Sequence, residues 1–144
     1  MRYKFVCGEK AEKHSQSTGD LTTFLATGSD TDGRVSIFDS YLKQGNGAPW
    51  HFHEEDDEIF YVITGEVEFG IDKEIVIAKP GDLVIAGPNV HRRFKALSDS
   101  HLLVINAPGG PSEGFLRDLL SLDHLPSEVD RARFVEKYGI HVVV

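Results

Sequence analysis

Three side chains that commonly bind metals lie close together in the middle of the chain. His51 and His53 are two residues apart, and Glu58 follows five residues later. On a β-strand, residues i and i+2 face the same side, so the two imidazoles can point at one place. Glu58 opens the apolar run 59–63 and can bring a carboxylate to that place from the next strand. Two imidazoles and a carboxylate suit Fe, Mn, Ni, Cu or Zn, so we expect one divalent transition metal here.

The segments around these residues have the pattern of short β-strands separated by turns. Residues 67–71 alternate Val, Phe and Ile with Glu and Gly, which is typical of a strand with one buried face. Pro80 and Gly81 supply the backbone conformations that a tight turn needs. Several such strands predict an all-β sandwich or barrel. The expected strands are 21–27, 34–42, 58–64, 67–71, 74–78, 83–86, 92–97 and 101–106.

The last part of the chain has helical spacing instead. Ser112 is expected to cap a first helix, which carries Phe115 and three leucines. Ser127 and Asp130 resemble a capping box for a second helix, and Gly139 fits the position just after its end. We therefore expect one domain over residues 1–144, with a barrel over about residues 20–108 and two short helices over about residues 112–139.

Composition narrows the possible partners and the location. The chain has 144 residues and a formal net charge of −8, which argues against nucleic acid and anionic membrane surfaces as partners. No apolar run approaches the length of a membrane span. Cys7 is the single cysteine, which fits a reducing compartment, and no long apolar segment occurs near the N-terminus. We expect a cytoplasmic protein with a small-molecule ligand.

The stretch from Gly45 to Gly65 fits the first cupin motif, G-x5-H-x-H-x4-E-x6-G, at every stated position. Over roughly residues 20–142 the chain resembles single-domain bacterial cupins of the quercetin dioxygenase-like kind. The resemblance implies a jelly-roll barrel, the double-stranded β-helix, with two short C-terminal helices. It also implies a metal inside the barrel, held by the three motif residues and by one histidine of a second motif. A homodimer is implied as well.

The second motif is where this chain departs from the family. Its pattern, G-x5-P-x-G-x2-H-x3-N, places Arg92 at the histidine when it starts at Gly81, and the nearby His91 is one residue early. On a regular strand, Arg92 inward brings Phe94 inward, whereas His91 inward would bury Arg93 and Lys95 without partners, which is costly. A β-bulge before Arg92 would still bring His91 inward as a fourth metal ligand.

These alternatives lead to two hypotheses about function. The resemblance implies a metal-dependent dioxygenase that acts on a flavonol or another enolisable compound, with Glu58 as ligand and proton acceptor. Phe60 and Phe94 are expected to line the substrate pocket, and Arg92 to clamp a substrate carboxylate or enolate. The alternative is a binding module without catalysis, in which Arg92 replaces the histidine and a small anion is held. The acidic residues 54–57 are expected to form a solvated turn rather than ligands.

Overall fold

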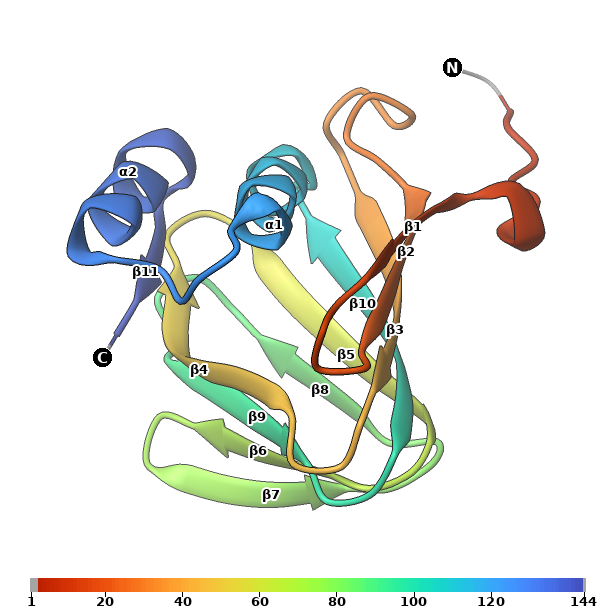
Figure 1. The fold of residues 1–144 in the computed structure, drawn as a ribbon, viewed down its shortest axis with the longest axis vertical. Helices are drawn as coiled ribbons and strands as arrows, with labels where there is room; N and C mark the ends of the chain where they lie inside the picture. Colours follow the sequence, from red (N-terminus) through yellow and green to blue (C-terminus); the bar gives the residue numbers. More distant parts are fainter. Residues whose placement is uncertain (1–2, 144) are drawn as a thin grey trace.

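The computed structural model describes residues 3–143, which form two antiparallel β-sheets packed face to face and two helices at one end (Figure 1). The six-stranded sheet has the order β1-β2-β3-β10-β5-β8, and the five-stranded sheet has the order β11-β4-β9-β6-β7. This is a jelly-roll barrel with short C-terminal helices, as the sequence predicts. No helix among these residues has both the length and the apolar character needed to cross a bilayer.

The six-stranded sheet is formed by segments from across the chain. Its members are β1 (Glu12–Ser15), β2 (Leu21–Ala26), β3 (Ser36–Leu42), β10 (Ser100–Ala107), β5 (Asp57–Thr64) and β8 (Leu83–Ala86). The inner face of β5 carries Phe60 and Val62, because alternate residues of a strand face the same side, and both are almost fully buried. The predicted strands match β2, β3, β5, β8 and β10 to within two residues at each end.

The five-stranded sheet closes the other side of the barrel. Its members are β11 (Ile140–Val142), β4 (Gly47–His53), β9 (Arg92–Ala96), β6 (Val67–Ile71) and β7 (Glu74–Ala78). Phe69 and Ala96 from this sheet pack against Phe60, Val62 and Leu102 of the other sheet, and together they form the core. The expected strands omit β4, although the spacing of His51 and His53 assumed a strand at these residues. Two further strands, β1 and β11, were not expected from the sequence. Both are short, and their pairing with β2 and β4 sets them in the sheets.

Glycine closes the turn after β5, and the backbone requires it there. Gly65 has φ +85°, and a Cβ at this position would lie 2.2 Å from Ser100 Oγ. Any larger residue would therefore have to displace the start of β10, the strand that pairs with β5. The last glycine of the first motif thus holds the β5–β10 pairing that positions Glu58.

The helices are α1 (Gly110–Ser121) and α2 (Glu128–Tyr138), preceded in the chain by a short 3-10 turn, η1 (Gly8–Lys10). The capping box of α2 is present between Ser127 and Asp130, and Gly139 ends the helix in the left-handed conformation, with φ 65°. The expected role of Ser112 as an N-cap is wrong: the N-cap is Gly109, three residues earlier, and α1 begins at Gly110. Ser112 is buried in the first turn, and its hydroxyl is used elsewhere, as described below.

Candidate metal centre

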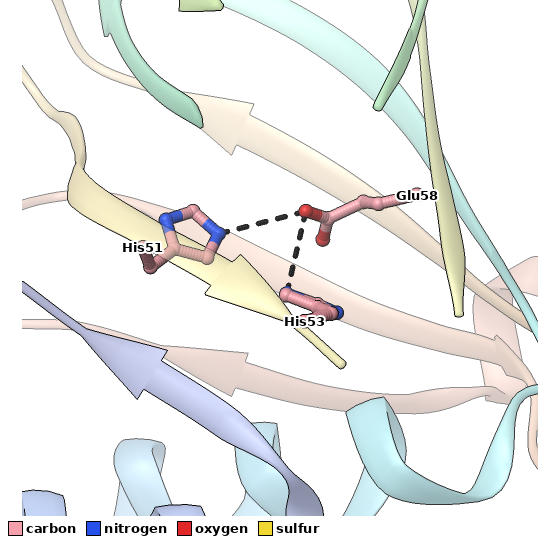
Figure 2. Close-up of side chains that lie close together, drawn as sticks. All are labelled: His51, His53 and Glu58. Atoms are coloured by element: carbon pink, nitrogen blue, oxygen red, sulfur yellow. Dashed lines mark ion pairs between the residues drawn. The ribbon is translucent and has the colours of Figure 1, made fainter. Parts of the chain in front are cut away.

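The barrel brings His51, His53 and Glu58 together at one point between the two sheets (Figure 2). His51 and His53 lie at the end of β4, two residues apart, so both rings project to the same inner side. Glu58 lies at the start of β5 in the opposite sheet. All three side chains are buried, and one potential ligand atom from each lies within 4.8 Å of the others. The convergence that strand spacing suggested is therefore present in the fold.

The carboxylate oxygen Oε1 of Glu58 lies 3.5 Å from Nε2 of His51 and 3.5 Å from Nε2 of His53 (Figure 2). Ligand atoms that share one metal, each about 2.1 Å from it, are separated by about 3 to 3.5 Å. The Nδ1 atoms face acceptors: the carbonyl of Pro49 for His51, at 2.9 Å, and the Asp56 carboxylate for His53. Because acceptors require Nδ1–H donors, the neutral rings direct Nε2 lone pairs toward Glu58.

These three atoms are arranged to bind a cation rather than to form hydrogen bonds with one another. Both His53 Nε2 and Glu58 Oε1 are buried and have no hydrogen-bond partner, and an unpartnered buried polar atom is costly. Burial would raise the pKa of Glu58, but the positive charge of His53 and His51 when their rings are protonated, together with that of Arg92, lowers it from 4.5 to about 2. A divalent metal would take the place of the ring protons and supply the positive charge instead. The carboxylate is therefore ionised at neutral pH. Three lone-pair donors around one point are the arrangement that a divalent transition metal binds.

A second carboxylate, which the sequence reasoning missed, orients one of the ligands. Asp56 is 1% exposed, and its two oxygens accept hydrogen bonds from His53 Nδ1 at 2.9 and 3.0 Å. Asn106 Nδ2 and Ser112 Oγ also donate to Asp56, at 2.9 and 2.8 Å. The expectation that all of residues 54–57 form a solvated turn is thus wrong for Asp56. The signal was the spacing to His53, since i+3 is close in a tight turn.

The position expected for a fourth ligand is filled by Arg92, not by His91. The Arg92 side chain is fully buried, and its Nε lies 3.9 Å from Glu58 Oε1. His91 lies on the outer surface, where its ring stacks on Phe52 at 4.5 Å between centroids. The structure therefore does not bring His91 to the three converging side chains. This corrects the expectation that included His91 among the ligands.

Strand register explains why Arg92 faces inward. Arg92 on β9 pairs with His51 on β4, and residues paired across antiparallel strands share a face. A register shift does occur beside the site, but in β4 between Ala48 and His51 rather than before Arg92. Asn89, with φ 65°, makes the turn that leads into β9. The alternation along β9 is regular as a result, with Arg92 and Ala96 buried and Lys95 exposed.

A cavity of about 140 Å³ opens beside these three side chains. His51, His53 and Glu58 form one part of its wall, and Phe60 and Phe94, which the sequence singled out, form another. Helix α1 covers this end of the barrel and adds Phe115, Leu116 and Leu119 (Figure 1). The remaining lining residues are Thr22, Phe38, Ser40, Ala48, Val104, Asn106 and Ser112. Most of this wall is apolar.

Arg92 is not among the residues that line the cavity, although the sequence suggested it as a substrate clamp. Its Nη2 donates to the carbonyl oxygens of Ala86 and Gly87, at 2.9 and 3.0 Å. Burial lowers the pKa of Arg92, and the carboxylates of Glu58, Asp56 and Asp72 oppose that effect. A guanidinium stays charged in proteins, so Arg92 is a fixed cation beside the ligands.

The comparisons with known proteins agree with this architecture. Residues 38–108 match the family model described as Cupin domain. The curated quercetin 2,3-dioxygenase of Bacillus subtilis (strain 168) is 29% identical to this chain over 94 residues. That match covers 65% of this chain but only 27% of the dioxygenase, so the chain spans about a quarter of that relative's length.

Solved structures with similar folds come from several organisms. KdgF from Halomonas sp. is similar with a TM-score of 0.66 and 21% identity, over 74% of this chain and 94% of that chain. An RmlC-like cupin from Shewanella frigidimarina has a TM-score of 0.64 and 19% identity, over 76% and 92%. Pac13, a nucleoside dehydratase of Streptomyces, has a TM-score of 0.60 and 20% identity, over 75% and 83%. At these identities the likeness concerns the fold.

Proposed function

This chain belongs to the cupins, and from that premise we propose that it is a metal-dependent enzyme that oxidises a small organic molecule with O₂. The observation that carries the proposal is the convergence of one potential ligand atom each from His51, His53 and Glu58 at a buried point. They would hold one divalent transition metal. When bound, Fe, Mn, Ni or Cu would supply the Lewis-acid and redox chemistry that O₂ requires, whereas Zn²⁺ would supply Lewis-acid chemistry alone.

The residues of the chain have distinct roles in this proposal. Asp56 keeps the His53 ring in the tautomer that presents Nε2, and the Pro49 carbonyl does the same for His51. Glu58 serves as a ligand. A carboxylate whose pKa is about 2 is a weak base at neutral pH, so the role of proton acceptor is less well supported.

The cavity supports a substrate smaller than a flavonol. Pockets that hold drug-sized ligands usually measure about 300 to 1,000 Å³, whereas this one measures about 140 Å³. A three-ring flavonol would require α1 to move away, since its side chains form part of the wall. The apolar wall favours a compact apolar body, such as a single ring or a short branched chain, with an enolisable oxygen group directed at Glu58.

Asn106 adds a polar requirement to this cavity. Its Nδ2 donates to Asp56, which can only accept, so the orientation of the amide is set. Asn106 Oδ1 is then buried without a partner, on a residue that lines the cavity. A substrate that offers a hydroxyl or N–H donor would satisfy this oxygen. We therefore propose a hydroxyl-bearing, enolisable compound of one ring or less.

The test combines metal analysis with O₂ consumption. Purified protein is loaded with Fe²⁺, Mn²⁺, Ni²⁺, Cu²⁺ or Zn²⁺ in turn, and O₂ uptake is followed with single-ring hydroxyketones and with a flavonol. We expect one metal per chain, and uptake with at least one single-ring compound that His51→Ala combined with His53→Ala abolishes. The variant His91→Ala, altered on the outer surface, should retain it. Metal binding without uptake for any compound would refute the enzymatic part.

A non-catalytic binding module is the second candidate, and Arg92 favours it. A positive side chain at the fourth position disfavours a divalent metal and favours an anion. In that case the purified protein would contain no metal, would keep its thermal stability in chelator, and would bind a small carboxylate. Stoichiometric metal that chelator removes, with loss of thermal stability, would exclude this candidate.

We also propose a cytoplasmic homodimer, paired through the outer face of the six-stranded sheet. Large apolar side chains are exposed there on neighbouring strands β5 and β8: Tyr61 by 38%, Ile63 by 37%, Leu83 by 51% and Ile85 by 60%. Since β8 is the edge of its sheet, pairing would also cover an exposed strand edge. Contiguous apolar surface of this kind is typical of interaction sites.

A further inference from the structure

Arg92 occupies a position where its charge must act on the metal ligands. The guanidinium is completely enclosed, and two backbone carbonyls, of Ala86 and Gly87, hold its Nη2 in place. Its Nε lies 3.9 Å from Glu58 Oε1, which is too far for a hydrogen bond. The charge is therefore anchored next to Glu58 as an ion pair that lacks a hydrogen bond.

Two of the Arg92 donors lack acceptors. Nε and Nη1 are both buried and have no hydrogen-bond partner in the structure. Guanidinium N–H groups cannot accept, so only an additional acceptor can satisfy them. A buried donor without an acceptor is costly, and the cost is larger when the donor is charged. The cavity that Glu58 lines, next to Arg92 but not in contact with it, thus favours an electron-rich guest.

The formal charges lead to the same conclusion. As ionised groups Glu58 and Asp56 contribute −2 and Arg92 contributes +1, and both rings are neutral in the form that binds a metal. A divalent metal would bring this buried group to +1 and would lie beside the guanidinium, which repels it. One small anion would bring the sum to zero. Buried charge is tolerated only when it is paired, so metal and anion stabilise each other here.

We propose that Arg92 makes metal binding at this site depend on a small anion such as a carboxylate or enolate. The inference rests on the proposed metal site and names what the site takes together with the metal. A metal alone binds weakly, an anion alone binds weakly, and the two together bind tightly. The anionic oxygen of the substrate thereby favours binding of the metal at the same site.

The experiment measures Co²⁺ binding by isothermal titration calorimetry with and without sodium formate, at ionic strength held constant with sodium perchlorate. We expect formate to lower the Co²⁺ dissociation constant of the wild-type protein about tenfold or more, within the usual range of coupling between two ligands. In the absence of formate, Arg92→Met should bind Co²⁺ more tightly than the wild-type protein does. Adding formate should change the Co²⁺ dissociation constant of this variant less than twofold. Arg93→Met is the matched control. Arg93 is the next residue and pairs with Glu68 at 3.0 Å away from the ligands, so this variant should behave as wild type.

Each outcome bears on a separate claim. Wild-type protein that binds Co²⁺ equally well with and without formate would overturn the role of Arg92 and leave the metal site intact. The same formate dependence in Arg92→Met as in wild type would also overturn it. Protein that binds no Co²⁺ in either condition would overturn the proposed function itself. If Arg92→Met fails to fold, Arg92→Gln takes its place, since it also removes the charge, and the same two outcomes decide.

Discussion

His53 and Asp56 form a buried pair in which the Nδ1–H of the imidazole donates to both carboxylate oxygens, at 2.9 and 3.0 Å. Asn106 and Ser112 donate to the same carboxylate. Burial alone would raise the pKa of Asp56, but its bonds to His53, Ser112 and Asn106 outweigh burial and lower it. One carboxylate thus connects His53 on β4, the strand β10 and the first turn of α1. A ligand held in this way keeps its ring orientation before any metal arrives.

Replacing Asp56 by Asn should weaken metal binding about 10- to 100-fold, the usual effect of losing the partner of a metal-binding histidine. The amide keeps the size of the side chain but removes the negative charge that favours the Nδ1–H tautomer. Calorimetric titration with Co²⁺ measures the change. Asp57→Asn is the matched control, because Asp57 is the neighbouring residue and is exposed. Equal affinities for the two variants would contradict the role given to Asp56.

The double substitution His51→Ala with His53→Ala should abolish metal uptake, since it removes two of the three converging ligand atoms. Elemental analysis of protein purified from metal-supplemented cultures gives the stoichiometry. His91→Ala should retain the metal, because His91 packs against Phe52 on the outer surface. Unchanged metal content in the double variant would show that the metal, if any, is bound elsewhere.

The two helices should be a stable part of the fold, because Phe134 of α2 is fully buried and packs edge-on against Phe115 of α1 at 5.1 Å. Phe134→Ala should lower the free energy of unfolding by about 3 to 5 kcal/mol, the range for buried phenylalanines. Val129→Ala, on the same helix at a position 75% exposed, should change it by no more than about 0.5 kcal/mol. Urea denaturation gives the free energy of unfolding of each variant. A similar loss in the two variants would argue against a firmly packed α2.

Stability should fall at high pH through Tyr138, whose hydroxyl donates to Asp118 at 2.6 Å and so connects α2 to α1. Burial and this hydrogen bond raise the pKa of Tyr138 from 10 to about 12. The folded protein therefore holds the proton more tightly than the unfolded chain. The resulting stability is complete below pH 10 and is lost as the pH rises from 10 toward about 12.

Urea denaturation of Tyr138→Phe, at pH values below 10 and near 12, tests this expectation. The variant should be less stable than wild type below pH 10 and should lose less stability between these two values. Tyr61→Phe, on the outer face of the six-stranded sheet, should keep the wild-type dependence. The idea fails if Tyr138→Phe and wild type lose stability in parallel.

The proposed homodimer predicts that Tyr61→Lys combined with Ile85→Lys produces a monomer, because two charges would lie in the apolar outer face of β5 and β8. Size-exclusion chromatography with light scattering gives the mass. Ile75→Lys combined with Ile77→Lys is the control, since these residues are 64% and 52% exposed on β7, at the far edge of the other sheet. A wild-type protein of monomer mass would remove the proposal.

Local patterns in the sequence were enough to predict much of the fold. Alternation located most of the strands, because a strand with one buried face must alternate. The capping box of α2 and its final glycine were also visible, since both depend on neighbouring residues alone. The spacing of His51, His53 and Glu58 predicted their convergence for a similar reason: β4 and β5 follow each other in the chain, and the short turn between them brings the end of one close to the start of the other in the opposite sheet.

The features of the site that depend on segments far apart in the chain were decided by the tertiary structure. Whether Arg92 or His91 faces inward follows from the pairing of Arg92 with His51, about forty residues earlier, and from a register shift in β4 that no local pattern marks. The burial of Asp56 depends on donors from β10 and α1, which come near only when the barrel closes. The size of the cavity likewise depends on where α1 packs. The sequence by itself determined the kind of centre, and long-range packing determined its fourth position, its supporting carboxylate and its volume.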